Sequence, residues 1–198
     1  LTISAEDRMR SGMYQSEQGR RQLQKNSVSL EEFLKQLEIK ATLGHIDNDT
    51  LTRVAQLMAK TNQFNLTSRR HSASDLQELV DSGAVALWLR VADRYGDNGL
   101  VGVGVAVPGN EGHWTIDSLL MSCRVFGRGV ETALISGLTR EIITRGGKTV
   151  LGEYIPTAKN AMVANLYPDH GFAEVKGNSK QWKWDLSSGE VPVSDYVT

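Results

Sequence analysis

A glycine-bearing turn between a strand and a helix constrains this chain more than any other stretch. Residues 113–121 are largely apolar and predict a strand, and after the turn apolar residues recur every fourth position, at Val130, Leu134, Leu138 and Ile142. Glycine lets the backbone approach a ligand closely, and the first N–H groups of a helix have no partner within it. These donors and the helix dipole favour an anion such as a phosphate. The turn therefore predicts an anion site, although an ordinary strand–helix turn also explains these residues.

The composition is that of a single globular domain. The chain has 198 residues, of which 40% are hydrophobic and 23% are charged, so it can bury a sizeable core. The formal net charge of −1 gives no reason to expect a nucleic acid or a membrane surface as partner. One cysteine rules out an internal disulfide, and no apolar run has membrane-spanning length. We therefore expect a cytoplasmic protein, and we predict no metal site.

Helical and strand patterns alternate along the rest of the chain. Helices are predicted from apolar periodicity and from capping residues at 1–25, 29–37, 51–58, 72–82, 130–145 and 158–167. Strands are predicted at 39–44, 84–91, 100–107, 113–121, 149–155 and 181–186. The expected caps are Ser4, Ser29 and either Ser72 or Ser74. The polar tail after residue 186 is expected to be loose.

Two polar stretches permit more than one interpretation. Residues 47–50 fit the nucleophile motif of haloacid-dehalogenase phosphatases, but that motif must end a buried strand, and 41–46 is a poor one. We favour the alternative in which Asp49 or Thr50 caps the next helix. In the polar stretch 60–70, Arg69 and Arg70 could meet an anionic group, although a solvated loop explains them equally well.

Two motifs together resemble the GNAT acyltransferases. Arg124-x-x-Gly127-x-Gly129 resembles their pyrophosphate loop, and about forty residues later 160–172 resembles their segment ending in Tyr-x-x-x-Gly-Phe. The resemblance implies an α/β fold: a mixed, mostly antiparallel sheet, splayed in the middle, with helices on both faces. The pantetheine arm of coenzyme A would lie in the split between the strands 113–121 and 149–155.

The same resemblance implies site residues. The cofactor-binding residues would be Met121, Ser122, Arg124, Val125, Phe126, Gly127, Arg128, Gly129 and Asn160. Tyr167 would protonate the departing thiolate as general acid, although it could instead pack in the core with its hydroxyl merely satisfied. Asp117 and Glu153 lie on the two strands that should splay and are candidate bases; a carboxylate at a strand edge is the alternative.

Cys123 is the only cysteine, and it lies where the strand meets the turn. The unpaired N–H groups of the helix and the neighbouring Arg124 should favour its thiolate and lower its pKa. Cys123 could then relay an acyl group from a donor to a pantetheine thiol. The alternative is a small hydrophobic residue that fills the sheet.

Longer strings resemble the C-terminal domain of the FkbH-like family over about residues 46–176. The matching strings are 56–57, 60–67, 93–102, 120–128 and 156–160. We accordingly divide the chain into a helical connector (1–45), a GNAT-like acyltransferase domain (46–186) and a polar tail (187–198). Members of that family load a glyceryl group from 1,3-bisphosphoglycerate onto the phosphopantetheine thiol of an acyl carrier protein, as in polyketide biosynthesis. The partners implied are an acyl carrier protein and an upstream phosphatase-like domain, which this sequence lacks.

Two other functions stay open at this point. The chain could be an N-acyltransferase that uses free acetyl-CoA, or a non-catalytic domain that docks a carrier protein. All three functions place pantetheine, either of coenzyme A or of a carrier protein, in the same split. The sequence does not identify the acyl group, the carrier or the oligomeric state.

Overall fold

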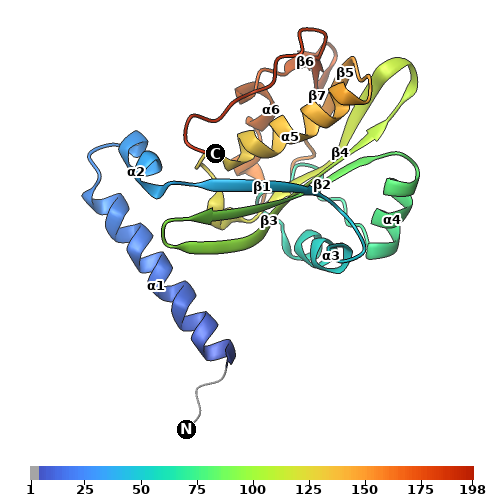
Figure 1. The fold of residues 1–198 in the computed structure, drawn as a ribbon. Coiled ribbons are helices and arrows are strands. Elements are labelled where there is room, and N and C mark those ends of the chain that lie inside the picture. Colours follow the sequence, from blue (N-terminus) through green and yellow to red (C-terminus); the bar gives the residue numbers. More distant parts are fainter. Residues whose placement is uncertain (1–4) are drawn as a thin grey trace.

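The computed structural model describes residues 5–198, with side chains from residue 11 onward except residue 179, so the predicted cap Ser4 lies outside the described residues (Figure 1). The helices are α1 (Ala5–Asn26), α2 (Leu30–Leu37), α3 (Leu51–Lys60), α4 (Ala73–Asp81), α5 (Val130–Thr144) and α6 (Leu166–Asp169). The strands are β1 (Lys40–His45), β2 (Val85–Asp93), β3 (Gly96–Pro108), β4 (His113–Met121), β5 (Thr149–Glu153), β6 (Ala173–Val175) and β7 (Asn178–Asp185). Three short 3₁₀ turns are η1 (Asn110–Gly112), η2 (Cys123–Val125) and η3 (Ala161–Val163).

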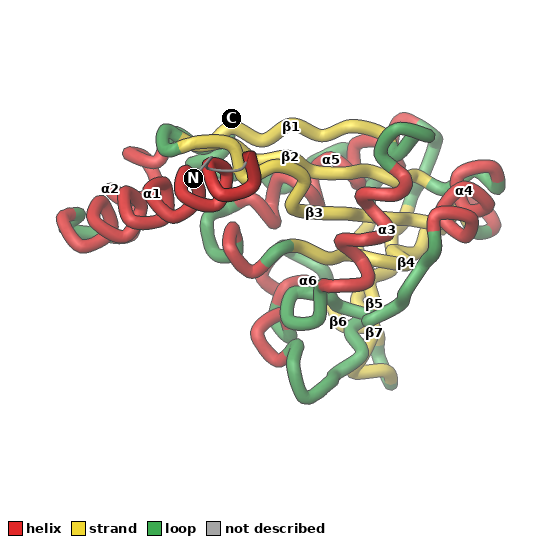
Figure 2. Tube along the Cα trace, turned by 90° about the horizontal axis from the view of Figure 1, so that it is seen from below, coloured by secondary structure: helices red, strands yellow, loops and turns green. Residues whose placement is uncertain are grey.

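The strands form one seven-stranded sheet in the order β1-β2-β3-β4-β5-β7-β6. Figure 2 shows β1 to β4 running side by side. Every neighbouring pair is antiparallel except β4 and β5, which are parallel and pair at only three positions, the last being Thr115 with Leu151. Beyond those positions the two strands separate, and we call this gap the split. The predicted mixed, mostly antiparallel, splayed sheet is confirmed.

Helices cover both faces of the sheet. Side chains of β2 alternate between two apolar clusters, because successive residues of a strand point to opposite faces. Leu87 and Leu89 pack in the cluster that contains α5, whereas Ala86 packs in the cluster that contains α3 and α4. On β3, Gly104 leaves the room that Leu138 of α5 fills. Helix α5 therefore lies on one face of the sheet, and α3 and α4 lie on the other.

The N-terminal helices and the C-terminal tail both contact this sheet. Arg20 of α1 donates two hydrogen bonds to Asp93, of 2.7 and 3.0 Å, while the N-terminal end of α1 extends away from the sheet (Figure 1). The tail returns to the edge strand β1, where Ala41 N–H donates to Thr198 O at 2.8 Å and Thr198 N–H donates to Ile39 O at 3.1 Å. The prediction of a loose tail is therefore wrong, because its backbone pairs with a strand edge that would otherwise be open. The domain division at residue 46 stays a prediction.

Two local predictions also need correction. Thr50 is the N-cap residue of α3, as predicted, but its side chain makes no capping bond; the carboxylate of Asp47 instead accepts from Thr50 N–H at 3.0 Å. The stretch 47–50 follows the partly exposed edge strand β1, which does not supply the buried strand that the phosphatase motif requires. The predicted helix 158–167 is replaced by η3 and the short α6. Asn160 explains the change, because its side chain bonds to Thr157 N–H and Ile155 O and so holds residues 155–160 in a turn instead of a first helical turn.

Ser29 and Ser72 are confirmed as caps of α2 and α4. Across residues 5–198, no helix has both the length and the apolar character that crossing a membrane requires. In the same range, no three His, Cys, Asp or Glu side chains are arranged to hold a metal ion.

Candidate functional site

A β-bulge in β4 marks the inner end of the split. The register with β3 shifts between Ile116 and Ser118, so Asp117 is an extra residue without a partner in that ladder. A bulge bends the strand and redirects its side chain. Asp117 lies two residues past Thr115, the last residue of β4 that pairs with β5.

Five polar residues, which we call the split cluster, meet at this bulge: Arg69, His71, Asp117, Ser118 and Glu153. His71 Nε2 lies 2.7 Å from Asp117 Oδ2, and the Ser118 hydroxyl donates to the same oxygen at 2.7 Å. Arg69 donates to the backbone oxygen of Asp117 and to Glu153 Oε2, both at 2.8 Å. The two predicted bases are thus brought together by one arginine. The sequence analysis missed His71, because a single histidine before a helix cap carries no pattern.

Tyr167 lies beside the split cluster. Its side chain is 1% exposed and stacks with Trp182, with 5.8 Å between ring centroids. Its ring lies so close to Gly152 that a Cβ there would overlap it. The hydroxyl is buried and has no hydrogen-bond partner within residues 5–198. Burial raises the pKa of this hydroxyl well above its usual range, the charge of Glu153 adds to that shift, and the N–H of Glu153 and the charge of Arg69 oppose it. The ring carbon that carries the hydroxyl lies against Gly152, next to Glu153, so the hydroxyl lies beside the split cluster.

Part of the chain itself crosses the split. Residues 64–67, which we call the bridging segment, are all buried. Leu66 N–H donates to Leu119 O at 3.2 Å, and Met121 N–H donates to Phe64 O at 3.0 Å, so the segment pairs with β4. On the other side, Ile155 N–H donates to Leu66 O at 2.8 Å. Backbone groups of β4 that were expected to face a pantetheine arm are therefore bonded to the chain.

Asn160 fixes the bridging segment. This fully buried side chain donates from Nδ2 to Asn65 O at 2.8 Å and to Ile155 O at 3.0 Å. Its Oδ1 accepts from Thr157 N–H at 2.7 Å. Both ends of the amide are thus used within the chain. The role of Asn160 toward a cofactor stays a prediction.

The predicted anion loop connects β4 to α5. Gly127 and Gly129 adopt φ values of 74° and 78°, which glycine tolerates and other residues rarely adopt. The side chains of Met121 and Val125 are buried, and Phe126 packs edge-on against Phe64. Backbone groups of the loop, rather than those three side chains, would therefore meet a phosphate.

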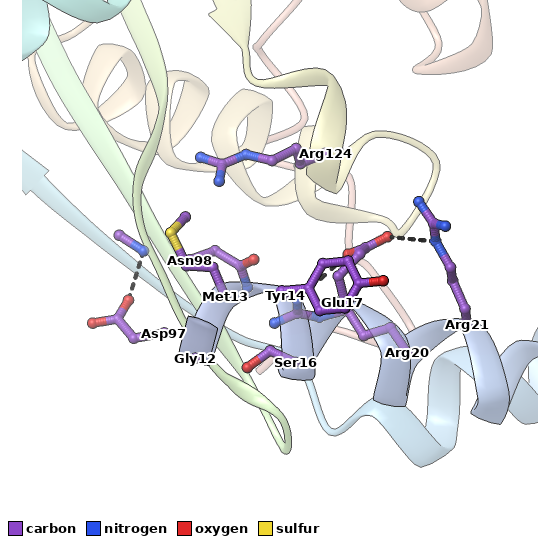
Figure 3. A pocket seen from close by; sticks show the side chains of 11 residues that line it. Gly12, Met13, Tyr14, Ser16, Glu17, Arg20, Arg21, Asp97, Asn98 and Arg124 are labelled. Atoms are coloured by element: carbon purple, nitrogen blue, oxygen red, sulfur yellow. Dashed lines mark hydrogen bonds and ion pairs between the residues drawn. The ribbon is translucent and has the colours of Figure 1, made fainter. Parts of the chain in front are cut away.

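The two loop arginines differ in their surroundings. Arg124 is exposed and donates to the Ser122 hydroxyl at 3.3 Å. It faces residues of α1, including Arg20 and Arg21, across a cleft of about 800 Å³ (Figure 3). Arg128 turns inward, with 3.8 Å between its NH1 and Asp93 Oδ2, and burial together with the nearby charge of Arg20 lowers the pKa of Arg128. Arg124 is thus the better placed of the two for a ligand.

Cys123 is exposed and lines a second cleft of about 490 Å³. Other residues of that cleft include Lys60, Phe64 and Lys159. This cleft lies beside the bridging segment. The predicted thiolate and the acyl relay stay predictions.

Glu131, which the sequence analysis did not single out, is the acidic residue in the first turn of α5. Burial raises its pKa, and the N–H groups of Glu131, Gly129 and Gly127, together with His170, oppose that shift. One of its carboxylate oxygens is buried without a hydrogen-bond partner in the described part of the chain. The carboxylate therefore lies at the start of α5, next to the anion loop.

Glu131→Gln should change how stability depends on pH. A carboxyl group whose pKa is raised by folding holds its proton more tightly in the folded state. The wild type therefore loses stability as pH rises from the unfolded-state pKa of 4.5 through the higher pKa of the folded state. The neutral variant does not lose this stability. We expect Glu131→Gln to be more stable than wild type at pH 7 and about equal at pH 4, in urea unfolding at both values. If the two proteins differed in free energy of unfolding by the same amount at pH 4 and pH 7, folding would not raise the pKa of Glu131.

Solved structures show which fold this is. The chain is similar to an acetyltransferase of the GNAT family from Staphylococcus aureus Mu50, with a TM-score of 0.58, 8% identity, and coverage of 74% of this chain and 99% of the other. It is also similar to the ribosomal-protein-S18-alanine N-acetyltransferase of Escherichia coli, with a TM-score of 0.51, 14% identity, and coverage of 72% and 89%. A third structure is Rv2747 from Mycobacterium tuberculosis in complex with CoA, with a TM-score of 0.54, 16% identity, and coverage of 69% and 74%.

These similarities establish that the chain has the GNAT fold. At such identities they show the fold alone. No protein-family model matches the chain, and no curated protein sequence matches it. The resemblance to the FkbH-like family stays a prediction.

Proposed function

We propose that this domain transfers an acyl group between a pantetheine thiol and a second acceptor. The observation that carries the proposal is the buried Tyr167 hydroxyl, which has no partner in residues 5–198 and lies beside the split cluster. A buried polar group without a partner is costly, and such groups are retained where a ligand completes them. The GNAT fold supports the same class of chemistry by analogy.

Tyr167 acts as the general acid. Its raised pKa keeps the hydroxyl protonated near neutral pH, so a proton is available for the departing thiolate sulfur. Arg69, 2.8 Å from Glu153, holds a positive charge at the same place and stabilises negative charge that develops there. The rings of Trp182 and Phe172 hold the tyrosine in position.

His71 acts as the general base toward the acceptor. An ionised carboxylate only accepts hydrogen bonds, so His71 Nε2 carries the hydrogen that points to Asp117, and Nδ1 is the basic nitrogen. Asp117 orients the ring through this hydrogen bond. His71 removes the acceptor proton while Tyr167 donates one to the departing sulfur, and the proton on His71 then returns to Tyr167. When a pantetheine thiol is the acceptor, His71 takes the thiol proton and Tyr167 protonates the group that leaves.

The finer proposal is that the acyl group is of the glyceryl type and that the thiol belongs to an acyl carrier protein, in polyketide or related biosynthesis. It rests on the FkbH-like resemblance. An N-acyltransferase that uses free acetyl-CoA is the second candidate. A non-catalytic docking domain is the third, and the bridging segment favours it, because peptide groups of β4 next to the split are already bonded.

Transfer assays separate these functions. The chain is incubated with a glyceryl thioester donor and a carrier protein bearing a free phosphopantetheine thiol, and separately with acetyl-CoA and simple amines. Glyceryl loading predicts one added acyl mass on the carrier protein, and His71→Gln should lower the rate by about 10²-fold or more. Acetylated amine supports the second candidate. Carrier binding without any transfer would leave only the docking function.

A further inference from the structure

The anion loop contains a group that diphosphate binding does not explain. Glu131 is the second residue of α5, where a ligand phosphate would meet the unpaired N–H groups of the helix. Only Val130 separates Glu131 from the N-cap Gly129, and one of its carboxylate oxygens is buried without a hydrogen-bond partner among the described residues. The chain thus places its own negative charge among the donors that an anion would use.

The tail narrows the same place. A Cβ on Gly129 would overlap the Ser194 hydroxyl and lie 3.6 Å from Val197 Cγ2, so the tail lies directly against the start of α5. Figure 1 shows the C-terminus beside that end of the helix. Space beside Gly129 is therefore limited, whereas Gly127 is open.

From these observations we infer that Glu131 is a specificity-determining residue: it excludes the diphosphate of coenzyme A from the loop, so that the site selects pantetheine ligands carrying one phosphate or none. The inference rests on the proposed function, because it concerns the same pantetheine site. A diphosphate would bring two negative groups against a carboxylate that is partly withdrawn from water, where like charges repel strongly.

A single phosphate can avoid this repulsion at the rim of the loop. Arg124 is exposed there. A cleft of about 210 Å³ beside Gly127 is lined by four arginines and one acidic residue: Arg20, Arg21, Arg124, Arg128 and Glu17. Two guanidinium groups suit a phosphate monoester, which accepts charge-assisted hydrogen bonds. The positively charged rim and the acidic interior together favour binding of a ligand with one phosphate over a ligand with a diphosphate.

Calorimetric titration tests this inference with four defined ligands: coenzyme A, dephospho-coenzyme A, 4′-phosphopantetheine and pantetheine. Wild type should bind 4′-phosphopantetheine roughly tenfold or more tightly than either coenzyme A form. Glu131→Gln keeps the shape and removes the charge. It should tighten binding of coenzyme A and dephospho-coenzyme A by roughly tenfold while leaving pantetheine unchanged.

Glu141→Gln is the matched control, because it removes the same charge from the other end of α5. It should leave the order of the four ligands unchanged. Wild type that binds coenzyme A as tightly as 4′-phosphopantetheine, or Glu131→Gln that leaves the coenzyme A affinity unchanged, overturns the inference but not the proposed function. If none of the four ligands binds any of the three proteins, the proposed function fails and the inference fails with it.

Discussion

Tyr167→Phe should abolish most acyl transfer while leaving the fold intact or slightly more stable. Loss of a general acid lowers the rate by about 10²–10⁴-fold. The hydroxyl is buried without a partner in the described chain, so its removal relieves a desolvation cost and should raise the free energy of unfolding by roughly 1 kcal/mol. Transfer rate and urea unfolding, measured on the same preparation, separate the two effects.

Tyr154→Phe is the control for this prediction. Tyr154 lies near the same residues, but its hydroxyl makes a long bond of 3.4 Å to Asn160 Oδ1. Its loss should change the transfer rate little. Full activity in Tyr167→Phe would remove the acid role and leave Tyr167 as a packing residue of the core.

Asn160→Ala should be the most destabilising of the polar substitutions considered. It removes three short hydrogen bonds and the long one from Tyr154, and it leaves the backbone oxygen of Asn65 buried and unsatisfied. Each such group costs about 1–3 kcal/mol, so we expect the free energy of unfolding to fall by about 3 kcal/mol. In a chain of this length, the thermal midpoint should fall by roughly 6–12 °C.

Asn62→Ala is the matched control, because Asn62 is an exposed asparagine whose hydrogen bond joins it to Arg70 at the surface. It should change stability by less than about 0.5 kcal/mol. If the two alanine variants unfold at the same urea concentration, Asn160 does not fix the bridging segment. Its predicted role toward a cofactor would then be the better explanation of its position.

The sequence predicted those parts of the fold that short-range patterns determine. The strand at residues 113–121 and the start of α5 at Val130 agree with the structure, because apolar periodicity and glycine positions are local signals. The motif ending in Gly171-Phe172 located Tyr167, whose hydroxyl lies beside the split cluster. The sequence did not predict that this hydroxyl lacks a hydrogen-bond partner, because that depends on how residues from distant strands pack around it.

The missed features all depend on contacts between distant residues. Asn65 and Asn160 are 95 positions apart, and no local period links them. The bridging segment alternates apolar and polar residues but is too short to predict a strand within the polar stretch 60–70. His71 gains its candidate role only because a bulge in β4 brings Asp117 to it.

The bridging segment also affects how any measured affinity is interpreted. A ligand arm that uses Leu119 O and Met121 N competes with the hydrogen bonds of residues 64–67. The protein then has a closed form and an open form, and only the open form binds such an arm. The apparent affinity equals the intrinsic affinity multiplied by the open fraction, so a closed form favoured a hundredfold weakens binding by about a hundredfold. A carrier protein that shifts the equilibrium toward the open form would therefore bind more tightly than a small thiol, even if both ligands made identical contacts in the split.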